Sequence, residues 1–100
     1  MPRVYVPNRS GHDFSAATRF GELVFITEGL IDRFAVNTMY RECIKATKEA
    51  EEDDLILVSS LPILTSILTA VLGRKFGKVN FLLLWNDEYM KRSIDLDALL

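Results

Sequence analysis

The chain has 100 residues, of which 49% are hydrophobic and 26% charged, and its formal net charge is −2. This length and composition are typical of one globular domain, and they exclude a disordered or low-complexity chain. Because the basic residues are mostly scattered and the balance is acidic, we expect no nucleic-acid partner. The chain does not open with a signal peptide, so the expected location is cytoplasmic.

The cysteine and histidine content limits the chemistry of the chain. Cys43 is the only cysteine, which excludes an internal disulfide and a cysteine-based metal cluster. His12 is the only histidine, and no suitably spaced carboxylates accompany it, so we expect no metal and no cofactor. Cys43 falls among apolar residues at helical spacing, which predicts a thiol packed in the core.

The first part of the chain predicts a strand, a helix and a strand in turn. Arg3–Pro7 is β-branched and aromatic and ends at a proline, which is typical of a strand. After a polar loop, residues 14–20 form a short predicted helix, with Asp13 as its N-cap and Gly21 directly after it. Residues 22–27 are the second predicted strand.

The middle of the chain contains the clearest predicted helix. We expect residues 30–35 to return as the second arm of a hairpin, with residues 32–35 as the lead-in to a helix in the alternative. In 37–51 apolar residues recur three and four positions apart, and Asn37 caps this helix. The acidic turn 51–54 should lie on the surface, because its carboxylates would be unfavourable if buried without partners.

An apolar strand and a second helix follow the acidic turn. Residues 55–59 are continuously apolar up to Ser59, which is typical of a strand buried on both faces in a parallel sheet. The helix at 62–76 is opened by Ser59 or Ser60, has a proline in its first turn and is closed by Gly77. It is apolar nearly all round, which indicates burial by more than one neighbour.

The order of the elements predicts the fold class. Residues 78–85 and 88–94 form a final hairpin, so the full order is β-α-β-β-α-β-α-β-β. Consecutive βαβ crossovers require a parallel sheet with helices packed on it, and hairpins add antiparallel strands. We therefore expect residues 1–100 to form a single α/β domain: a small mixed sheet with a Rossmann-like parallel centre, two main helices and two β-hairpins.

One uncharged segment, Leu55–Leu72, is long enough to raise the question of a membrane span. It contains several hydroxyl side chains, and Pro62 lies near its middle. A buried strand, a turn and a buried helix explain the same segment, so we expect no membrane partner.

Two segments are candidate ligand sites because they follow parallel strands, where ligands bind in open α/β sheets. They consist of Asn8, Arg9, Ser10, Gly11, His12 and Asp13 after the first strand, and of Ser59 and Ser60 after the third. If the two segments share a cleft, Arg9 should face the start of the second long helix, and an anion such as a phosphate would bind between them. The structural alternative is that Asp13 and Ser60 are helix caps and Gly11 a turn residue.

An enzymatic use of the same segments has less support. His12 and Asp13 could act in acid–base chemistry and Ser10 as a nucleophile, but sequence neighbours rarely present the geometry of a triad, and there is no G-x-S-x-G motif. The layout resembles that of nucleoside deoxyribosyltransferases, which carry an acidic catalytic residue on a helix in the corresponding region. This chain has no Asp or Glu between Asp54 and Asp87.

The remaining candidate is a surface for self-association. Small and hydroxyl-bearing residues make one side of the second long helix narrow, so it could pack under the chain's own hairpin or against another copy. In the second case the expected interface consists of Thr65, Ser66, Thr69, Leu96, Leu99 and Leu100.

Three functions are therefore compatible with the sequence. The first is a non-catalytic interaction or accessory protein that associates with itself or with another protein. The second is a domain that binds a small molecule or a nucleotide through residues 8–13 and the two serines. The third is a minimal enzyme built on the same cleft, and the small number of titratable residues in the apolar half of the chain favours the first function over this one.

Overall fold

The computed structural model describes residues 1–9, 11–59 and 61–97. The elements in this part of the chain are, in order, β1 (Arg3–Arg9), η1 (Ser15–Phe20, a 3₁₀ helix), β2 (Glu22–Glu28), α1 (Val36–Ala46), β3 (Leu55–Leu57), α2 (Pro62–Phe76), β4 (Lys78–Trp85) and β5 (Glu88–Asp95). Four residues of the predicted sites, Ser10, Ser60, Leu99 and Leu100, lie outside the described residues.

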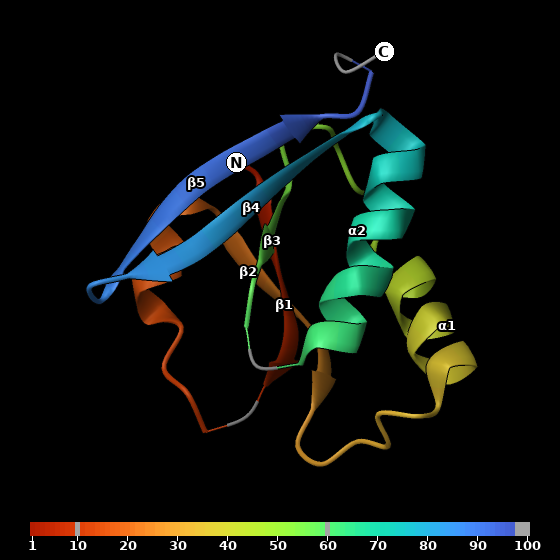
Figure 1. Ribbon diagram of the computed structural model, residues 1–100. Helices are drawn as coiled ribbons and strands as arrows, with labels where there is room; N and C mark the ends of the chain where they lie inside the picture. The colour runs from red at the N-terminus through yellow and green to blue at the C-terminus, as the bar shows by residue number, and fades with distance from the viewer. Residues whose placement is uncertain (10, 60, 98–100) are drawn as a thin grey trace.

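The strands form one mixed sheet in the order β2-β1-β3-β4-β5 (Figure 1). The first four strands in this order are parallel, and β5 runs antiparallel to β4. The predicted class, a small α/β fold with a parallel centre, is confirmed. The chain moves from β1 to one neighbour, β2, and then returns past β1 to β3 on its other side. The order of the strands therefore changes direction between β1 and β3.

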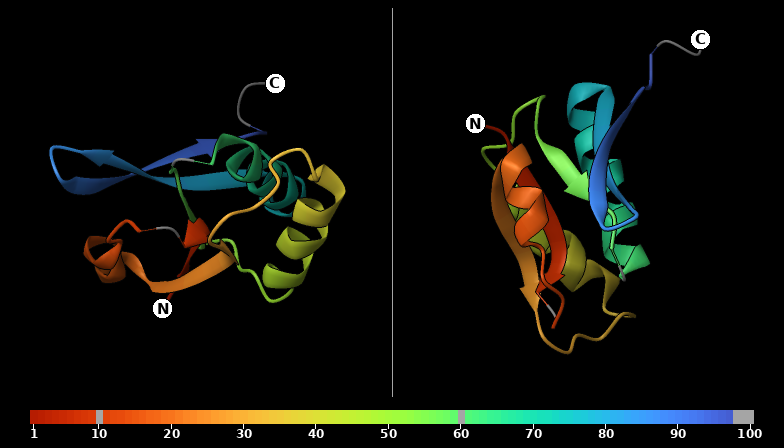
Figure 2. Two further views of the ribbon diagram at one scale, coloured as in Figure 1. Left: turned by 90° about the horizontal axis from the view of Figure 1, so that it is seen from below. Right: turned by 90° about the vertical axis from the view of Figure 1, so that its left-hand side faces the viewer.

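The connection from β1 to β2, which contains η1, lies on one face of the sheet, and the connections through α1 and α2 lie on the other. Right-handed crossovers that run in opposite directions along a sheet must lie on opposite faces. Tyr5 and Ile56 pack against α1 and α2 on one face, and Val4, Val6 and Leu57 pack near η1 on the other. Figure 2 shows η1 well separated from the two α-helices. Because neighbouring positions of β1 and β3 point to different faces, both strands are buried on two sides, as predicted for the strand at 55–59, although β3 already ends at Leu57.

One of the two predicted hairpins is absent. Residues 29–35, all of them described, form a loop instead of a returning strand, so the expected alternative of a lead-in to a helix is correct for residues 32–35. Gly29 turns the chain with a φ of 68°, and the Asp32 carboxylate accepts a hydrogen bond from the Phe34 amide at 2.9 Å. This local turn bends the backbone away from β2, which explains why the segment does not pair with it.

The helix ends differ in part from the predicted caps. α1 begins at Val36, so Asn37 lies inside the helix, and Leu61 rather than a serine occupies the N-cap position of α2. The sequence placed these caps incorrectly because a polar residue near a helix start resembles a cap even when the chain enters at another residue. Gly77 closes α2 in the left-handed conformation, as predicted.

The segment Leu55–Leu72 is divided between β3, a connection and the greater part of α2. Among the described residues there is no helix whose length and apolar character would suffice to cross a bilayer.

A polar network closes the amino end of the sheet. Residues 51–53 are exposed as predicted, but Asp54 is buried, and this part of the surface prediction is wrong. Its carboxylate accepts hydrogen bonds from the amides of Arg3 at 2.9 Å and Glu51 at 3.0 Å. It also accepts one from the Tyr5 hydroxyl at 3.0 Å. These donors replace water, so the buried charge has the partners that it requires.

Cys43 is fully buried in the core between the sheet and the helices, as predicted. Burial, with a smaller effect of Glu42, raises the pKa of its thiol to about 12. A thiol with this pKa stays protonated near neutral pH, and the thiolate is the reactive form. Cys43 therefore acts as a packing residue.

Candidate functional site

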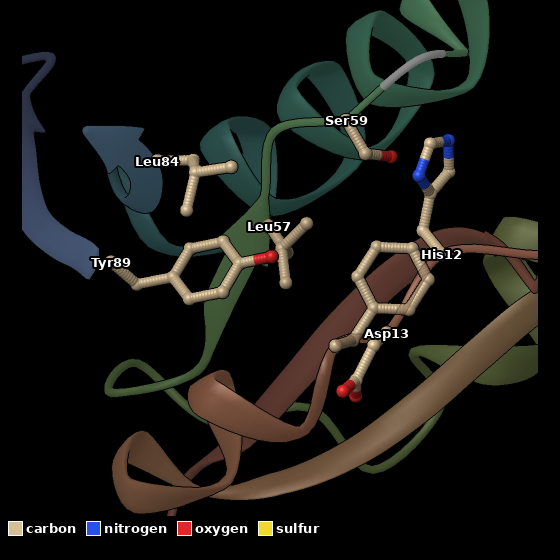
Figure 3. A pocket seen from close by; sticks show the side chains of 7 residues that line it. His12, Asp13, Leu57, Ser59, Leu84 and Tyr89 are labelled. Carbon is tan, nitrogen blue, oxygen red and sulfur yellow. The ribbon is translucent and has the colours of Figure 1, made fainter. Parts of the chain in front are cut away.

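A cavity of about 250 Å³ lies at the carboxyl ends of the parallel strands, on the face covered by η1. Its lining consists of His12, Asp13, Phe14, Leu57, Ser59, Leu84 and Tyr89 (Figure 3). These residues follow β1, end or follow β3, and occupy β4 and β5. The cavity thus lies where the strand order changes direction, the place at which open α/β sheets bind their ligands.

The segment after β1 is held in place by a short turn. Phe14 and not the predicted Asp13 occupies the N-cap position of η1, but the Asp13 carboxylate accepts a hydrogen bond from the Ser15 amide at 2.8 Å. The next side chain, Phe14, is buried against the sheet, and its ring lies 6.2 Å from that of His12 in an edge-on arrangement. This anchoring keeps the exposed His12 at the mouth of the cavity.

The opposite wall comes from the hairpin. The register of β4 and β5 pairs Leu84 with Tyr89, and paired residues point to the same face of a sheet. The Tyr89 ring is buried and its hydroxyl points into the cavity, while Leu84 is 57% exposed at the rim (Figure 3). Together with Leu57 and Phe14 they give the cavity an apolar floor and wall.

Three hydrogen-bonding side chains surround this apolar floor. The Ser59 hydroxyl is directed toward the His12 imidazole, and the Tyr89 hydroxyl faces the same space from the other side (Figure 3). Burial raises the pKa of Tyr89, and the charge of Asp13 raises it further. The Tyr89 phenol therefore remains protonated at neutral pH and can donate a hydrogen bond to a ligand.

The lining contains serine, histidine and aspartate, but not in the geometry of a catalytic triad. A triad requires the carboxylate to orient the imidazole. Asp13 is instead bonded to Ser15, and these hydrogen bonds lower the pKa of its carboxyl group. In Figure 3 the carboxylate points away from the His12 ring. The arrangement supports binding better than nucleophilic catalysis.

The structure brings only some of the predicted ligand residues together. His12, Asp13 and Ser59 share the cavity. Asn8 instead joins β1 to β2: its amide donates to the Gly29 carbonyl at 2.9 Å, and its carbonyl accepts from the Thr27 hydroxyl at 2.9 Å. Gly11 is exposed, with open space around it.

Arg9 lies outside the cavity. Its guanidinium is 3.8 Å above the Phe25 ring, and its Nε is 3.4 Å from the Glu28 carboxylate. Both contacts are with β2, so the guanidinium is directed toward β2 and away from the start of α2. Neither arginine nor lysine is among the described residues that line the cavity. In residues 1–9, 11–59 and 61–97 there is also no group of three metal-ligating side chains.

Sequence reasoning missed four of the lining residues, Phe14, Leu57, Leu84 and Tyr89. Phe14 belongs to a predicted helix and Leu57 to a predicted buried strand, and no ligand role is predicted for the hairpin residues. A turn at Asn86–Asp87 pairs position 84 with 89. This pairing was therefore available from the turn alone, although the face it occupies depends on the sheet order.

The predicted self-association residues on α2 are mostly engaged within the chain. The hydroxyls of Thr65, Ser66 and Thr69 donate to carbonyls four residues earlier in or before the helix. A Cβ at Gly73 would lie 3.0 Å from Leu96, so this side of α2 packs under the chain's own hairpin at that point. Leu96 itself remains 41% exposed.

The fold and the cavity define a small, doubly wound α/β domain with a candidate ligand site at its change of strand direction. The chain belongs to the family described as Phage Pam3 gp32-like protein, whose family model matches residues 2–97. The chain matches neither a curated protein nor a solved structure.

Proposed function

We propose that the chain binds a small, uncharged, flat molecule in the cavity at the carboxyl end of β1 and β3. The observation that carries this proposal is the Tyr89 hydroxyl, a protonated donor that faces the cavity from a buried ring. Ser59 and His12 lie across from it above an apolar floor. A few convergent polar groups over an apolar lining are typical of small-molecule sites.

The size of the cavity supports a ligand of one or two rings. An apolar cavity of roughly 150 Å³ in another protein is large enough to bind benzene. The present cavity, at about 250 Å³, has room for a somewhat larger heterocycle. A flat ring would contact Phe14 and Leu57, and polar groups on its edge would meet the hydroxyls of Ser59 and Tyr89.

The charge of the lining supports an uncharged ligand over a phosphate. A phosphate site needs arginine, lysine or several free amides. Arg9, the expected cation, contacts β2, while the Asp13 carboxylate lies at the cavity. A phosphate would therefore meet a negative charge without a facing guanidinium. The expected ligand is therefore a neutral heterocycle and not an anion.

Binding is tested by NMR chemical-shift changes with adenine, nicotinamide and indole as neutral probes and with inorganic phosphate and adenosine monophosphate as charged ones. We expect saturable shifts in His12, Ser59 and Tyr89 with a neutral ring, and no gain in affinity from a phosphate group. Tyr89→Phe should weaken binding of the responding probe about tenfold, because it removes one hydrogen bond to a buried ligand. Tyr40→Phe, which changes an exposed tyrosine on α1, is the matched control.

The proposal fails if none of the neutral probes shifts these residues, or if Tyr89→Phe and Tyr40→Phe bind the probe equally well. Tight binding of inorganic phosphate at the same residues would overturn the choice of an uncharged ligand.

A further inference from the structure

The two faces of the β4–β5 hairpin differ in what covers them. On the face toward η1, Leu82 and Tyr89 are buried, and Leu84 is 57% exposed at the rim of the cavity. On the opposite face, Leu83 is 41%, Met90 38% and Trp85 67% exposed. The turn end of the hairpin projects away from α2, the helix that covers this face near Val79 (Figure 1). Half of the hairpin therefore presents apolar side chains without a covering layer.

The uncovered face has an ordered arrangement of charge. The register places three cross-strand pairs in succession on this side of the hairpin: Trp85 with Glu88, Leu83 with Met90, and Phe81 with Arg92, of which Phe81 packs partly against the core. One end of the face is therefore acidic, its centre is apolar, and its other end is basic. Glu88 and Arg92 are each two residues from Met90, about 7 Å along the strand.

We propose that this hairpin face binds the same face of a second copy of the chain. The two-fold axis crosses the strands at Leu83 and Met90, so these side chains meet their own counterparts. The same axis places Glu88 opposite Arg92 of the partner subunit, and Arg92 opposite Glu88 of the partner subunit. Two-fold interfaces require a self-complementary patch, and equal spacing of opposite charges about an apolar centre provides one.

The same charges disfavour the simplest alternative, in which two β5 strands pair along their free edges. Antiparallel pairing over the full length of β5, Glu88–Asp95, would set Lys91 beside Arg92 of the partner subunit. It would also set Glu88 beside Asp95 of the partner subunit. Like charges directly opposite one another destabilise a strand pair, and basic residues on an edge strand protect it from such pairing.

The position of α2 sets the limit of the proposed interface. This helix covers Val79, so the partner's hairpin cannot extend along the whole of β4. Its turn would come to lie against the side of α2. The predicted interface residues Thr65, Ser66 and Thr69 belong to this helix and would border the contact instead of forming it.

The test uses Trp85, the only tryptophan of the chain, as a reporter. With increasing protein concentration we expect a blue shift of its fluorescence, together with a rise to dimer mass in sedimentation equilibrium. Glu88→Arg and Arg92→Glu should each weaken self-association about tenfold or more, because each places like charges together at two symmetric positions. An equimolar mixture of the two variants should recover the dimer, since every pair is then opposite in charge. The double variant should recover it as well.

Both residues are exposed, so circular dichroism should show each variant to be folded. A wild-type chain that stays monomeric at high micromolar concentration would overturn the proposal, as would a dimer that neither charge reversal weakens. Hydrogen exchange separates face packing from edge pairing: slower exchange of the outward amides of β5 on dimerisation would show that the edges pair. Failure of ligand binding would leave this inference untouched, because Trp85, Met90 and Arg92 do not line the cavity.

Discussion

The two ends of the parallel strands carry polar groups that are used in opposite ways. At the amino end, Asp54 and Asn80 are buried, and their side chains bond to neighbouring backbone and side-chain groups. At the carboxyl end, His12, Ser59 and the Tyr89 hydroxyl surround an open cavity. The polar groups at the amino end are hydrogen-bonded within the protein, whereas those at the carboxyl end offer donors and acceptors to a ligand.

This difference separates stability from function along one sheet. Buried polar groups that bond to one another fix the register of β1, β3 and β4, and the loss of one member leaves the others without partners. Polar groups at an open cavity are hydrated in the free protein, so their removal changes binding more than folding. Substitutions at the amino end should therefore lower the stability of the fold, whereas substitutions at the carboxyl end should mainly weaken binding.

The largest effect is expected from Asp54→Ala. The change removes the acceptor of the Tyr5 hydroxyl and of two backbone amides in a site with little access to water. We expect the free energy of unfolding to fall by about 3 kcal/mol. Urea denaturation measures it, with Asp53→Ala as the control because Asp53 is exposed in the same turn. Equal losses in the two variants would show that the network does not stabilise the amino end.

The next effect concerns two glycines, one at each end. A Cβ at Gly21 would lie 2.2 Å from the Pro2 carbonyl oxygen, whereas a Cβ at Gly11 would meet nothing within 4 Å. Gly21→Ala must therefore displace the start of β1 from β2, at a cost of about 2 kcal/mol. Gly11→Ala should be nearly neutral. Thermal melting of both variants checks this, and an unchanged melting temperature for Gly21→Ala would contradict the close approach.

These two positions also show what the sequence could and could not predict. Gly21 was recognised as a helix terminator from its place in the pattern, but its contact with Pro2 joins segments 19 residues apart in the chain. The sequence predicts Asp54 at the surface together with three other acidic residues. Its burial depends on donors from β1, which are distant in the sequence. Periodicity and turn residues thus predicted most elements, while contacts between distant segments decided which polar residues are structural.

The same limit applies to the candidate site. The rule that ligands bind beyond the carboxyl ends of parallel strands predicts that His12, Asp13 and Ser59 lie close together, and all three line one cavity. Arg9 was expected there as well, yet Glu28 and Phe25 on the neighbouring strand hold its side chain. No local pattern in the sequence indicates that β2 lies beside β1 in this register, so the direction of this side chain could not be predicted.

Alkaline pH should distinguish the contributions that Tyr5 and Tyr89 make to the stability of the fold. Burial and the Asp54 carboxylate raise the pKa of Tyr5, and burial raises the pKa of Tyr89. A raised pKa means that the phenol stabilises the fold below its unfolded value, near 10, and that this contribution is lost as the pH rises further. For Tyr5 the loss should reach roughly 1 kcal/mol at pH 11. Tyr5→Phe should therefore flatten the alkaline fall in stability, measured by urea denaturation, more than Tyr89→Phe does. The opposite order would show that the more strongly shielded phenol is the one in the cavity.

The smallest effect on stability is expected at the cavity itself. His12 is exposed and Ser59 half-buried, so His12→Ala and Ser59→Ala remove groups that water already solvates. Each should change the free energy of unfolding by no more than about 0.5 kcal/mol. Both should nevertheless weaken the binding of the neutral probe that shifts Tyr89, because in the complex these side chains replace water around the ring.

Ser66→Ala is the matched control for Ser59→Ala, since Ser66 is exposed on α2 and its hydroxyl donates to the Pro62 carbonyl. Denaturation measures the free energy of unfolding, and NMR titration of the same samples measures the affinity for the probe. A loss of stability at Ser59 as large as that at Asp54 would mean that the carboxyl end, like the amino end, is a structural network, and the contrast between the two ends would be wrong.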